Sequence, residues 1–377
     1  MTAILQSNAE RTDIVPRFES RRNKLRKLLR ATGADALLVT NFTNVTYLTG
    51  FTGDDSYFLV TRSREVLVSD ERYTTQLEEE CPGLKLEIRA PGAKMIQSVA
   101  KLVRRAKVSR LAFESASMTV GFHDRLTAAL PKVDSVRADS LVEQLRVIKD
   151  RHEIAATRVA IDQARRAFEV IKATLTPDQT EKQVAAELEN AMRRFGARGC
   201  SFPPIIAAGA RSALPHATPT DARIGDSDFV LVDWGACEHF YASDLTRLIV
   251  TGKISPKLRK IYRIVLKAQV AAIRAIRPGV TCQRVDGVAR SIIAKAGFGK
   301  HFGHGLGHGL GLDVHENPRL TRGSDTELKP GMIVTVEPGI YLPGWGGVRI
   351  EDDVLVTRDG HEVLSDVGKE LEDWVVG

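Results

Sequence analysis

A glycine-rich stretch in the last third of the chain carries four histidines. His301, His304, His308 and His315 lie in KHFGHGLGHGLGLDVHE. Glycine loses more conformational freedom on folding than any other residue, so a run this rich in it does not serve stability alone. His304 and His308 have the spacing of a zinc-binding HExxH helix, but Gly305 stands where that motif needs Glu, and glycine disfavours a helix. As extended chain, the stretch places His304 and His308 on one face, with bare glycines that let a substrate or a neighbouring backbone come close. The alternative is a surface loop with incidental histidines.

Two pairs of carboxylates accompany apolar runs in the second half of the chain. Asp233 and Asp244 lie in FVLVDWGACEHFYASDLTRLIV, and a turn near residues 238–239 would bring them roughly opposite each other on antiparallel strands. Glu337 ends another apolar run, and Glu351 lies in the return strand after a turn rich in proline and glycine. The sequence therefore predicts two hairpins that each deliver two carboxylates.

Such a group of acids predicts a metal centre. Isolated buried carboxylates are costly and are normally paired or bound to metal. Four carboxylates and the imidazole of His308 need at least two divalent cations to neutralise them. Oxygen-rich ligation with one nitrogen suits Mn²⁺, Fe²⁺ or Co²⁺, and Zn²⁺ is also compatible. Each acid taken alone could instead form a salt bridge at the end of a strand. That alternative does not readily explain why all five residues occur in this order.

The elements that must position these residues fall into two parts. The chain has 377 residues, more than one hydrophobic core usually spans, so we expect two domains, 1–143 and 144–377. The first is a small α/β unit in which no cluster of catalytic residue types occurs. Its expected elements are strands at 36–39 and 110–114, a hairpin around 61–64, and helices at 95–105 and 119–130.

The second part begins with a long helical stretch, 142–174, and a second helix follows at 181–195. Apolar β-runs dominate beyond residue 200, at 202–208, 229–234, 242–251, 332–337 and 348–357, and helical patterns occur at 256–276 and 281–296. Strands and helices grouped in this way indicate an α+β fold with helices packed on one side of a sheet.

The composition of the chain indicates which partners and which cellular compartment to expect. The net charge is +7, and many basic residues lie between residues 11 and 30. Leucines interleave them, so we expect an amphipathic helix with a solvated basic face rather than a nucleic-acid site. The four cysteines have no metal-binding spacing, which suggests reduced thiols, and no apolar run suits a signal peptide or a membrane span. We therefore expect a cytoplasmic protein.

The motifs around the candidate ligands resemble one group of peptidases. The ordered set Asp233, Asp244, His308, Glu337 and Glu351 resembles the ligand set of the dinuclear metallopeptidases with the pita-bread fold. The surrounding words resemble its proline-specific branch, the Xaa-Pro peptidases (prolidase and aminopeptidase P): FPPIIAAGARSALPHATP, YASDLTR, HGLGHGLGLDVHE, VTVEPGIY and GVRIEDDVLV. The resemblance spans about residues 145–365. It implies a pita-bread catalytic domain preceded by a smaller, creatinase-like α/β domain.

The same resemblance implies roles for the five ligands. Asp244 and Glu351 would bridge two metal ions, Asp233 would complete one site, and His308 and Glu337 the other. Mn²⁺ is the first expectation, with Co²⁺, Fe²⁺ or Zn²⁺ as alternatives. A hydroxide shared by the two ions would attack the scissile carbonyl, and Glu337 would handle the proton.

Further residues match the family's motifs outside the ligand set. His216 and His315 resemble the donors to the developing oxyanion and leaving nitrogen, although each could be an ordinary loop histidine. His304 resembles the histidine that shapes the proline pocket. The resemblance implies that Arg349 lies near the substrate. Alternatively, Arg349 forms an ion pair on the strand face with Asp353 or another neighbour.

Arg319 and three polar strand residues complete the set. In HENPRL, Arg319 falls where prolidases carry an arginine that binds the free carboxylate of a dipeptide, and its alternative is a solvated loop charge. Tyr241, Thr246 and Thr335 could orient the metal-binding carboxylates, or be ordinary strand residues.

The predicted function is hydrolysis of the Xaa-Pro bond, with a preference for a dipeptidase. A bond to proline has no N–H and a fixed φ, so peptidases that grip the backbone amide cannot use it. The first alternative is an Xaa-Pro aminopeptidase acting on longer peptides. A methionine aminopeptidase would lack this N-terminal domain, and a creatinase does not keep the metal ligands. The last alternative is a non-enzymatic peptide- or protein-binding pita-bread protein. The resemblance implies a homodimer, and neither nucleic acid nor a membrane is an expected partner.

Overall fold

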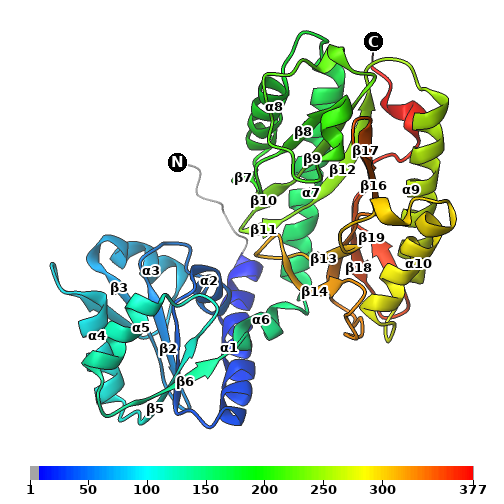
Figure 1. Ribbon diagram of the computed structural model, residues 1–377. Coiled ribbons are helices and arrows are strands. Elements are labelled where there is room, and N and C mark those ends of the chain that lie inside the picture. Colours follow the sequence, from blue (N-terminus) through cyan, green and yellow to red (C-terminus); the bar gives the residue numbers. More distant parts are fainter. Residues whose placement is uncertain (1–7, 377) are drawn as a thin grey trace. The chain divides into compact units, whose positions relative to one another are not determined.

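The computed structural model describes residues 8–376, and the chain divides into two compact units, Met1–Arg146 and Val147–Gly377 (Figure 1). The first unit is built on one mixed sheet in the order β4-β3-β2-β1-β5-β6. Its elements are α1 Asn8–Ala31, β1 Ala36–Val39, α2 Phe42–Thr49, β2 Tyr57–Thr61, β3 Glu65–Asp70, η1 Glu71–Tyr73, α3 Thr74–Glu80, β4 Leu86–Arg89, α4 Met95–Arg105, β5 Arg110–Glu114, α5 Val120–Ala129, β6 Asp134–Ala138 and α6 Leu141–Arg146. The predicted α/β unit, its strands and its hairpin are confirmed.

The basic segment of residues 11–30 lies in α1, and the side chains before residue 15 lie outside the described part. The predicted amphipathic helix is confirmed, because Leu25 and Leu29 are buried. The prediction that its basic face is solvated is wrong in part. Arg21 and Arg22 are buried, with guanidinium groups that donate to main-chain carbonyls of α2, and Arg22 also pairs with Glu65. A buried guanidinium needs such acceptors, and the end of a helix offers them.

The second unit holds two main sheets, β12-β9-β8 and β14-β13-β15-β18-β19, with the hairpin β16-β17 and the small sheet β11-β10-β7. Its strands are β7 Gly199–Cys200, β8 Ile205–Ala208, β9 Phe229–Trp234, β10 Ala236–Glu238, β11 Tyr241–Ala242, β12 Leu245–Val250, β13 Gly307–Gly309, β14 Glu316–Leu320, β15 Ile333–Val336, β16 Gly339–Leu342, β17 Gly346–Arg349, β18 Asp352–Val356 and β19 His361–Val363. Its helices are α7 Arg151–Thr174, α8 Glu181–Arg194, η2 Gly209–Ala213, η3 Ile224–Asp226, α9 Pro256–Ala275, α10 Cys282–Lys295, η4 Gly299–His301 and η5 Leu371–Trp374.

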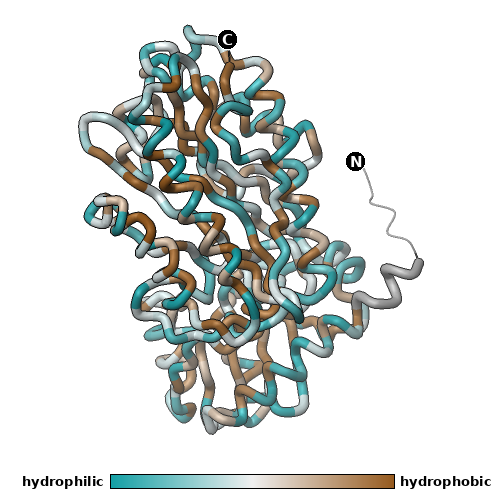
Figure 2. Tube along the Cα trace, turned by 90° about the vertical axis from the view of Figure 1, so that its right-hand side faces the viewer, coloured by the Kyte–Doolittle hydropathy of each residue, from teal (hydrophilic) through white to brown (hydrophobic). Residues whose placement is uncertain are grey.

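Strand β9 separates two hydrophobic cores of this unit. Val230, Val232 and Trp234 belong to the core formed with α7 and α8, whereas Phe229 and Leu231 belong to the core that contains α9 and α10. Alternate residues of a strand point to opposite faces, so both faces of β9 are covered. The expectation of helices on one side is therefore wrong, and the continuous apolar run of β9 is the pattern of a strand buried on both faces. In Figure 2 the helices alternate between hydrophobic and hydrophilic residues, as amphipathic helices do.

Other predicted element bounds are also corrected. The strands expected over 242–251 and 348–357 are each divided between two strands of different sheets. The helical stretch expected over 142–174 is interrupted, because Asp150 caps α7: its carboxylate accepts from the main-chain N–H of His152 and of Glu153, and Glu153 caps it in return. The strand expected from residue 202 begins at Ile205, because Pro203 and Pro204 have no N–H to donate to a ladder.

In the part of the chain that the structure describes, no helix is long and apolar enough to span a membrane. The four cysteines are free thiols.

The core against α7 yields a stability prediction. Phe168 is buried and stacks on Trp234, with ring centroids 4.0 Å apart and an interplanar angle of 21°. Phe168→Ala should lower the free energy of unfolding by about 3–5 kcal/mol, because it removes the buried ring and leaves a cavity. Urea denaturation followed by circular dichroism measures this. Val159→Ala, on the exposed side of the same helix, should change it by less than about 0.5 kcal/mol; equal effects of the two changes would contradict the packing argument.

Candidate active site

A hairpin brings Asp233 and Asp244 together. β9 and β12 pair antiparallel, with Asp233 opposite Thr246. Asp244 immediately precedes the first residue of β12 and therefore lies near Asp233. The strands approach closely here because of Gly235, at which a Cβ atom would lie 1.8 Å from the carbonyl oxygen of Ser243. Only glycine allows this contact.

A second hairpin brings Glu337 and Glu351 together. β15 and β18 pair antiparallel, and their last pair is Val336 with Asp352. Glu337 and Glu351 are the next residues on the two chains and therefore face each other. Glu351 also forms an isolated bridge with Thr246, which joins this hairpin to the first. The second hairpin has the register that the sequence predicted, whereas in the first Asp244 is offset by two residues from the partner of Asp233.

His308 enters from β13 between the two hairpins. Gly307 lies so close to β15 that a Cβ atom on it would be 2.0 Å from the carbonyl oxygen of Thr335. The main-chain N–H of His308 donates to the Thr335 hydroxyl at 3.1 Å, and its Nδ1 lies 3.1 Å from the next carbonyl oxygen. This leaves Nε2 facing Asp244, at 3.6 Å, and Glu337, at 3.4 Å. The glycines thus let a neighbouring backbone approach, as the sequence suggested.

The five predicted ligands converge, together with His315. Their ligand atoms form overlapping groups in which all atoms lie within 4.8 Å of one another: Asp233, Asp244 and Glu351; His308, Glu337 and Glu351; and Asp244, His308 and His315. Two of their oxygens, Oδ1 of Asp233 and Oε1 of Glu351, are buried without a hydrogen-bond partner among the described residues. Buried polar atoms are normally satisfied, so these oxygens mark places for further partners.

The electrostatics of the group also fit cations. Burial raises the pKa of Asp244 and of Glu351 well above the usual value, and the neighbouring carboxylates raise it further. Burial raises the pKa of Glu337 to about 8. Burial lowers the pKa of His308 to about 3, so its imidazole is neutral and its Nε2 can bind a metal. Divalent cations would stabilise the ionised carboxylates, and this donor set, rich in oxygen with one imidazole, fits them.

Arg349 links Asp233 to the second hairpin. Its buried guanidinium forms an ion pair with Asp233 at 2.5 Å, and donates to the hydroxyls of Tyr341 at 2.8 Å and Thr246 at 3.0 Å. Thr246 in turn donates to Glu351 at 2.6 Å. The ion pair on the strand face expected as the alternative is therefore made with a ligand candidate, rather than with Asp353.

His304 lies before β13, so the prediction that it shares a strand face with His308 is wrong. Extended pairing begins only at Gly307, because a bulge and the flanking glycines limit β13 to three residues. The Nε2 of His304 lies 2.9 Å from the Tyr341 hydroxyl, and its Nδ1 lies 2.7 Å from the carbonyl oxygen of Gly305. Its side chain still lines the same cavity as the ligands.

That cavity has a volume of about 600 Å³. His216, His315 and Arg319 line it and are exposed, and the ring centroids of His315 and His308 are 4.3 Å apart. Arg319 pairs in register with His308 in the neighbouring strand. The apolar wall of the cavity consists of Phe202, Pro203, Pro204, Ile205, Pro215 and Val314. All ten predicted site residues line this cavity, and His304 reaches it from a loop.

The three polar residues expected behind the ligands divide into two kinds. Thr246 donates to Glu351, and the Thr335 hydroxyl lies 3.4 Å from Oε1 of Glu337. The hydroxyl of Tyr241 donates to Glu153 of α7 at 3.0 Å, which ties β11 to that helix.

Sequence reasoning missed the residue that holds the His216 loop. Glu181, fully buried at the start of α8, accepts from the main-chain N–H groups of Ala208 and Thr220 and from Arg211. These partners lie at both ends of the loop that carries His216, so one carboxylate closes it. The sequence shows Glu181 only as a favourable first-turn acid of a helix, and its partners lie too far along the chain for any local pattern to reveal them.

The environment of His304 yields a pH prediction. Burial, and then the nearby Arg349, lower its pKa to about 4, below the ordinary 6.5. As the pH falls from 6.5 to 4, the unfolded chain takes up a proton that the folded protein does not, so stability is lost over this interval by about 3 kcal/mol.

Urea titrations of metal-free wild type and His304→Gln at several pH values measure this loss. The wild type should lose stability relative to the variant between pH 6.5 and 4. Parallel curves for the two proteins over that interval would contradict the assigned pKa.

Comparisons with known proteins agree with this site. The metallopeptidase family M24 model matches residues 155–358, and the creatinase/prolidase N-terminal domain model matches residues 21–148. An Xaa-Pro dipeptidase of Pyrococcus horikoshii is 37% identical over 349 residues, covering 92% of this chain and 97% of that protein. An Xaa-Pro dipeptidase from Bacillus anthracis has a similar structure, with a TM-score of 0.91, 39% identity, and coverage of 95% of this chain and 100% of that one. For an X-Pro aminopeptidase from Thermotoga maritima the TM-score is 0.85 at 35% identity, covering 92% and 98%.

These matches extend over both units and confirm the α+β pita-bread architecture and the resemblance drawn from the motifs. The chain belongs to metallopeptidase family M24, with a creatinase/prolidase N-terminal domain.

Proposed function

We propose that this protein is an Xaa-Pro dipeptidase that depends on two divalent metal ions. The observation that carries the proposal is the convergence of Asp233, Asp244, His308, Glu337 and Glu351 in one cavity, with oxygens of Asp233 and Glu351 left unpartnered. The names of the similar Xaa-Pro dipeptidases support the substrate class.

The grouping of the donor atoms supports a division into two metal sites. Asp233, Asp244 and Glu351 form one group, and His308, Glu337 and Glu351 form another. Glu351 belongs to both, and Asp244 lies 3.6 Å from the His308 ring, so these two carboxylates would help to hold both ions. Mn²⁺ is our first assignment, and Co²⁺, Fe²⁺ and Zn²⁺ share the preference for this donor set. Divalent cations in such a site supply Lewis acidity, which polarises a carbonyl and acidifies water.

The residues of the chain would divide the remaining work. Glu337 takes the proton from the attacking water and passes it to the leaving nitrogen of proline, which has no proton of its own. His216 and His315, exposed on the cavity wall, donate hydrogen bonds to the oxyanion and to the leaving group. His304 and the apolar wall accept the proline ring. Arg349 holds Asp233 in place through their ion pair.

Metal-dependent hydrolysis of Xaa-Pro dipeptides tests the proposal. Protein loaded with Mn²⁺ should cleave Gly-Pro-type dipeptides, and dialysis against a chelator should abolish the activity until Mn²⁺ is restored. Asp244→Ala should lower kcat by at least about 10³-fold, since it removes a ligand shared by both sites. Asp221→Ala, a matched change at an exposed acid, should leave kcat unchanged.

Other substrates separate the alternatives. Turnover of methionyl peptides or creatine in place of Xaa-Pro peptides would contradict the proposed specificity. A metal-loaded protein that cleaves none of them would favour a peptide- or protein-binding role.

The second candidate function is an Xaa-Pro aminopeptidase that cleaves longer peptides, and the similarity to the Thermotoga maritima enzyme favours it. Arg319 distinguishes the two functions. It is exposed in the cavity, and its Nη2 lies 3.5 Å from the carbonyl oxygen of His315, too long for a strong hydrogen bond, so the guanidinium is available to a carboxylate.

Arg319→Gln should lower kcat/KM for an Xaa-Pro dipeptide by about 10–100-fold, since it removes a charge-assisted hydrogen bond to the free carboxylate. A tripeptide, whose carboxylate lies elsewhere, should be affected less. Steady-state kinetics on both substrates give the ratio. Arg322→Gln, an exposed arginine just beyond β14, serves as the control. An equal loss for both substrates, or faster cleavage of tripeptides by the wild type, would favour the aminopeptidase.

The proposal also includes a cytoplasmic homodimer. Its free cysteines suit a reducing compartment. Light scattering coupled to size-exclusion chromatography measures the mass in solution.

A further inference from the structure

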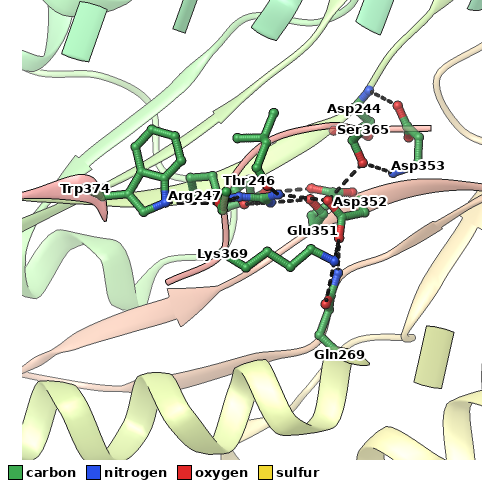
Figure 3. Close-up of polar contacts among 12 residues, drawn as sticks. Asp244, Thr246, Arg247, Gln269, Glu351, Asp352, Asp353, Ser365, Lys369 and Trp374 are labelled. Carbon is green, nitrogen blue, oxygen red and sulfur yellow. Dashed lines mark hydrogen bonds and ion pairs between the residues drawn. The ribbon is translucent and has the colours of Figure 1, made fainter. Parts of the chain in front are cut away.

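An arginine lies buried between the two chain segments that carry the ligand candidates Asp244 and Glu351. Arg247 belongs to β12, and none of its side chain is exposed. Its Nη1 donates to the carbonyl oxygen of Thr246 at 2.9 Å and to that of Glu351 at 2.6 Å. The N–H of Glu351 also donates to the Thr246 carbonyl, at 3.2 Å. Arg247 therefore reinforces the bridge that joins the two hairpins (Figure 3).

The rest of the guanidinium binds the C-terminal segment, residues 365–369. Its Nε donates to the carbonyl oxygen of Gly368 at 2.9 Å, and its Nη2 donates to that of Val367 at 2.8 Å. One side chain thus holds β12, Glu351 and the C-terminal segment together.

Asp352 neutralises this arginine. It has no exposed surface, and its Oδ1 accepts from Nη2 of Arg247 at 2.8 Å and from the Ser365 hydroxyl at 2.8 Å. Its Oδ2 accepts from Lys369 and from Gln269 of α9, which approach from the other side in Figure 3. Both oxygens of this buried carboxylate are satisfied.

Asp353, the next residue, holds the main chain of Asp244. Oδ2 of Asp353 accepts from the main-chain N–H of Asp244 at 3.1 Å, and the N–H of Asp353 donates to the Ser365 hydroxyl at 3.2 Å. Of three consecutive acids, Glu351 is therefore a ligand candidate. The next two, Asp352 and Asp353, help to fix the main chain at Glu351 and at Asp244.

Stability alone does not explain this arrangement. Burying two charges costs about as much as their attraction returns, and apolar residues of similar volume often serve as well. Apolar residues could not donate to the carbonyl oxygens of Thr246 and Glu351. Carboxylates as close as Asp244 and Glu351 repel each other, so their main chains must be held if they are to stay at ligand distance without a cation.

We propose that Arg247, Asp352 and Lys369 are positioning residues that set the separation of Asp244 and Glu351 for metal binding. The inference rests on the proposed dinuclear metal centre. Partners behind metal ligands commonly change metal affinity by about 10–100-fold when they are replaced.

The test is metal affinity rather than activity. Asp352→Asn keeps the shape of the side chain and removes its charge. Isothermal titration calorimetry of the metal-free full chain with Mn²⁺ should show affinity weakened by about 10–100-fold. The visible absorption spectrum of the Co²⁺-loaded variant should change, because the ligand geometry changes. Near-ultraviolet circular dichroism shows whether the metal-free variant is folded.

Two further variants separate positioning from loss of stability. Lys369→Met alters a partly exposed side chain, with 24% of its surface accessible, so it is a milder change and should weaken Mn²⁺ binding in the same direction. Val184→Ala makes a cavity in α8, a helix that supplies no residue of the network, and should keep wild-type Mn²⁺ affinity while lowering stability.

Folded Asp352→Asn and Lys369→Met proteins whose Mn²⁺ affinity lies within about twofold of wild type would overturn the inference. So would equal weakening by Val184→Ala, because lost stability would then account for the effect. A wild type that binds Mn²⁺ but cleaves no Xaa-Pro peptide would contradict the proposed function alone, and the affinity comparison would still decide on the positioning role.

Discussion

Repulsion among buried carboxylates is the constraint on which this structure depends. Asp233, Asp244 and Glu351 are at most 7% exposed, and Glu337 joins them within ligand distance. Ionised groups this close in a protein interior are costly unless opposite charge is present. Arg349 contributes one positive charge against four carboxylates. Divalent cations can supply the balance that would otherwise require protonation of these carboxyl groups, and the surrounding strands hold the group in place.

The fold meets this constraint twice with the same device. Each pair of acids lies where two antiparallel strands leave their ladder, and the register brings Glu337 opposite Glu351 and Asp233 within two residues of the position opposite Asp244. A strand fixes side-chain direction by its period of two, so a slip by one residue would send an acid into the apolar core. The cores on both faces of β9 resist such a slip. Rigid strands therefore position the site more accurately than loops could.

Patterns of local origin were predictable, and contacts across long separations were not. The hairpins around Asp233 and Glu337 follow from apolar runs interrupted by turns, and the family's motifs gave the order of the ligands. The break before α7 was missed because a capping box at Asp150 stops a helix within a sequence that is otherwise helical. Glu181 and Arg247 were missed because their partners lie far along the chain, and a buried charge looks in sequence like an exposed one.

Arg247 lies where main-chain carbonyl oxygens of two strands need hydrogen-bond donors. β12 and β18 belong to different sheets, so the regular ladder is interrupted where Thr246 meets Glu351, and carbonyl oxygens there need donors from elsewhere. Guanidinium offers five N–H donors in a rigid plane, enough to serve both strands and the C-terminal segment, whereas an ammonium group would act as a single point charge. A buried guanidinium needs a counter-ion, and Asp352 provides it. Lys369 adds a second positive charge to Asp352, so Arg247, Asp352 and Lys369 together keep one net positive charge.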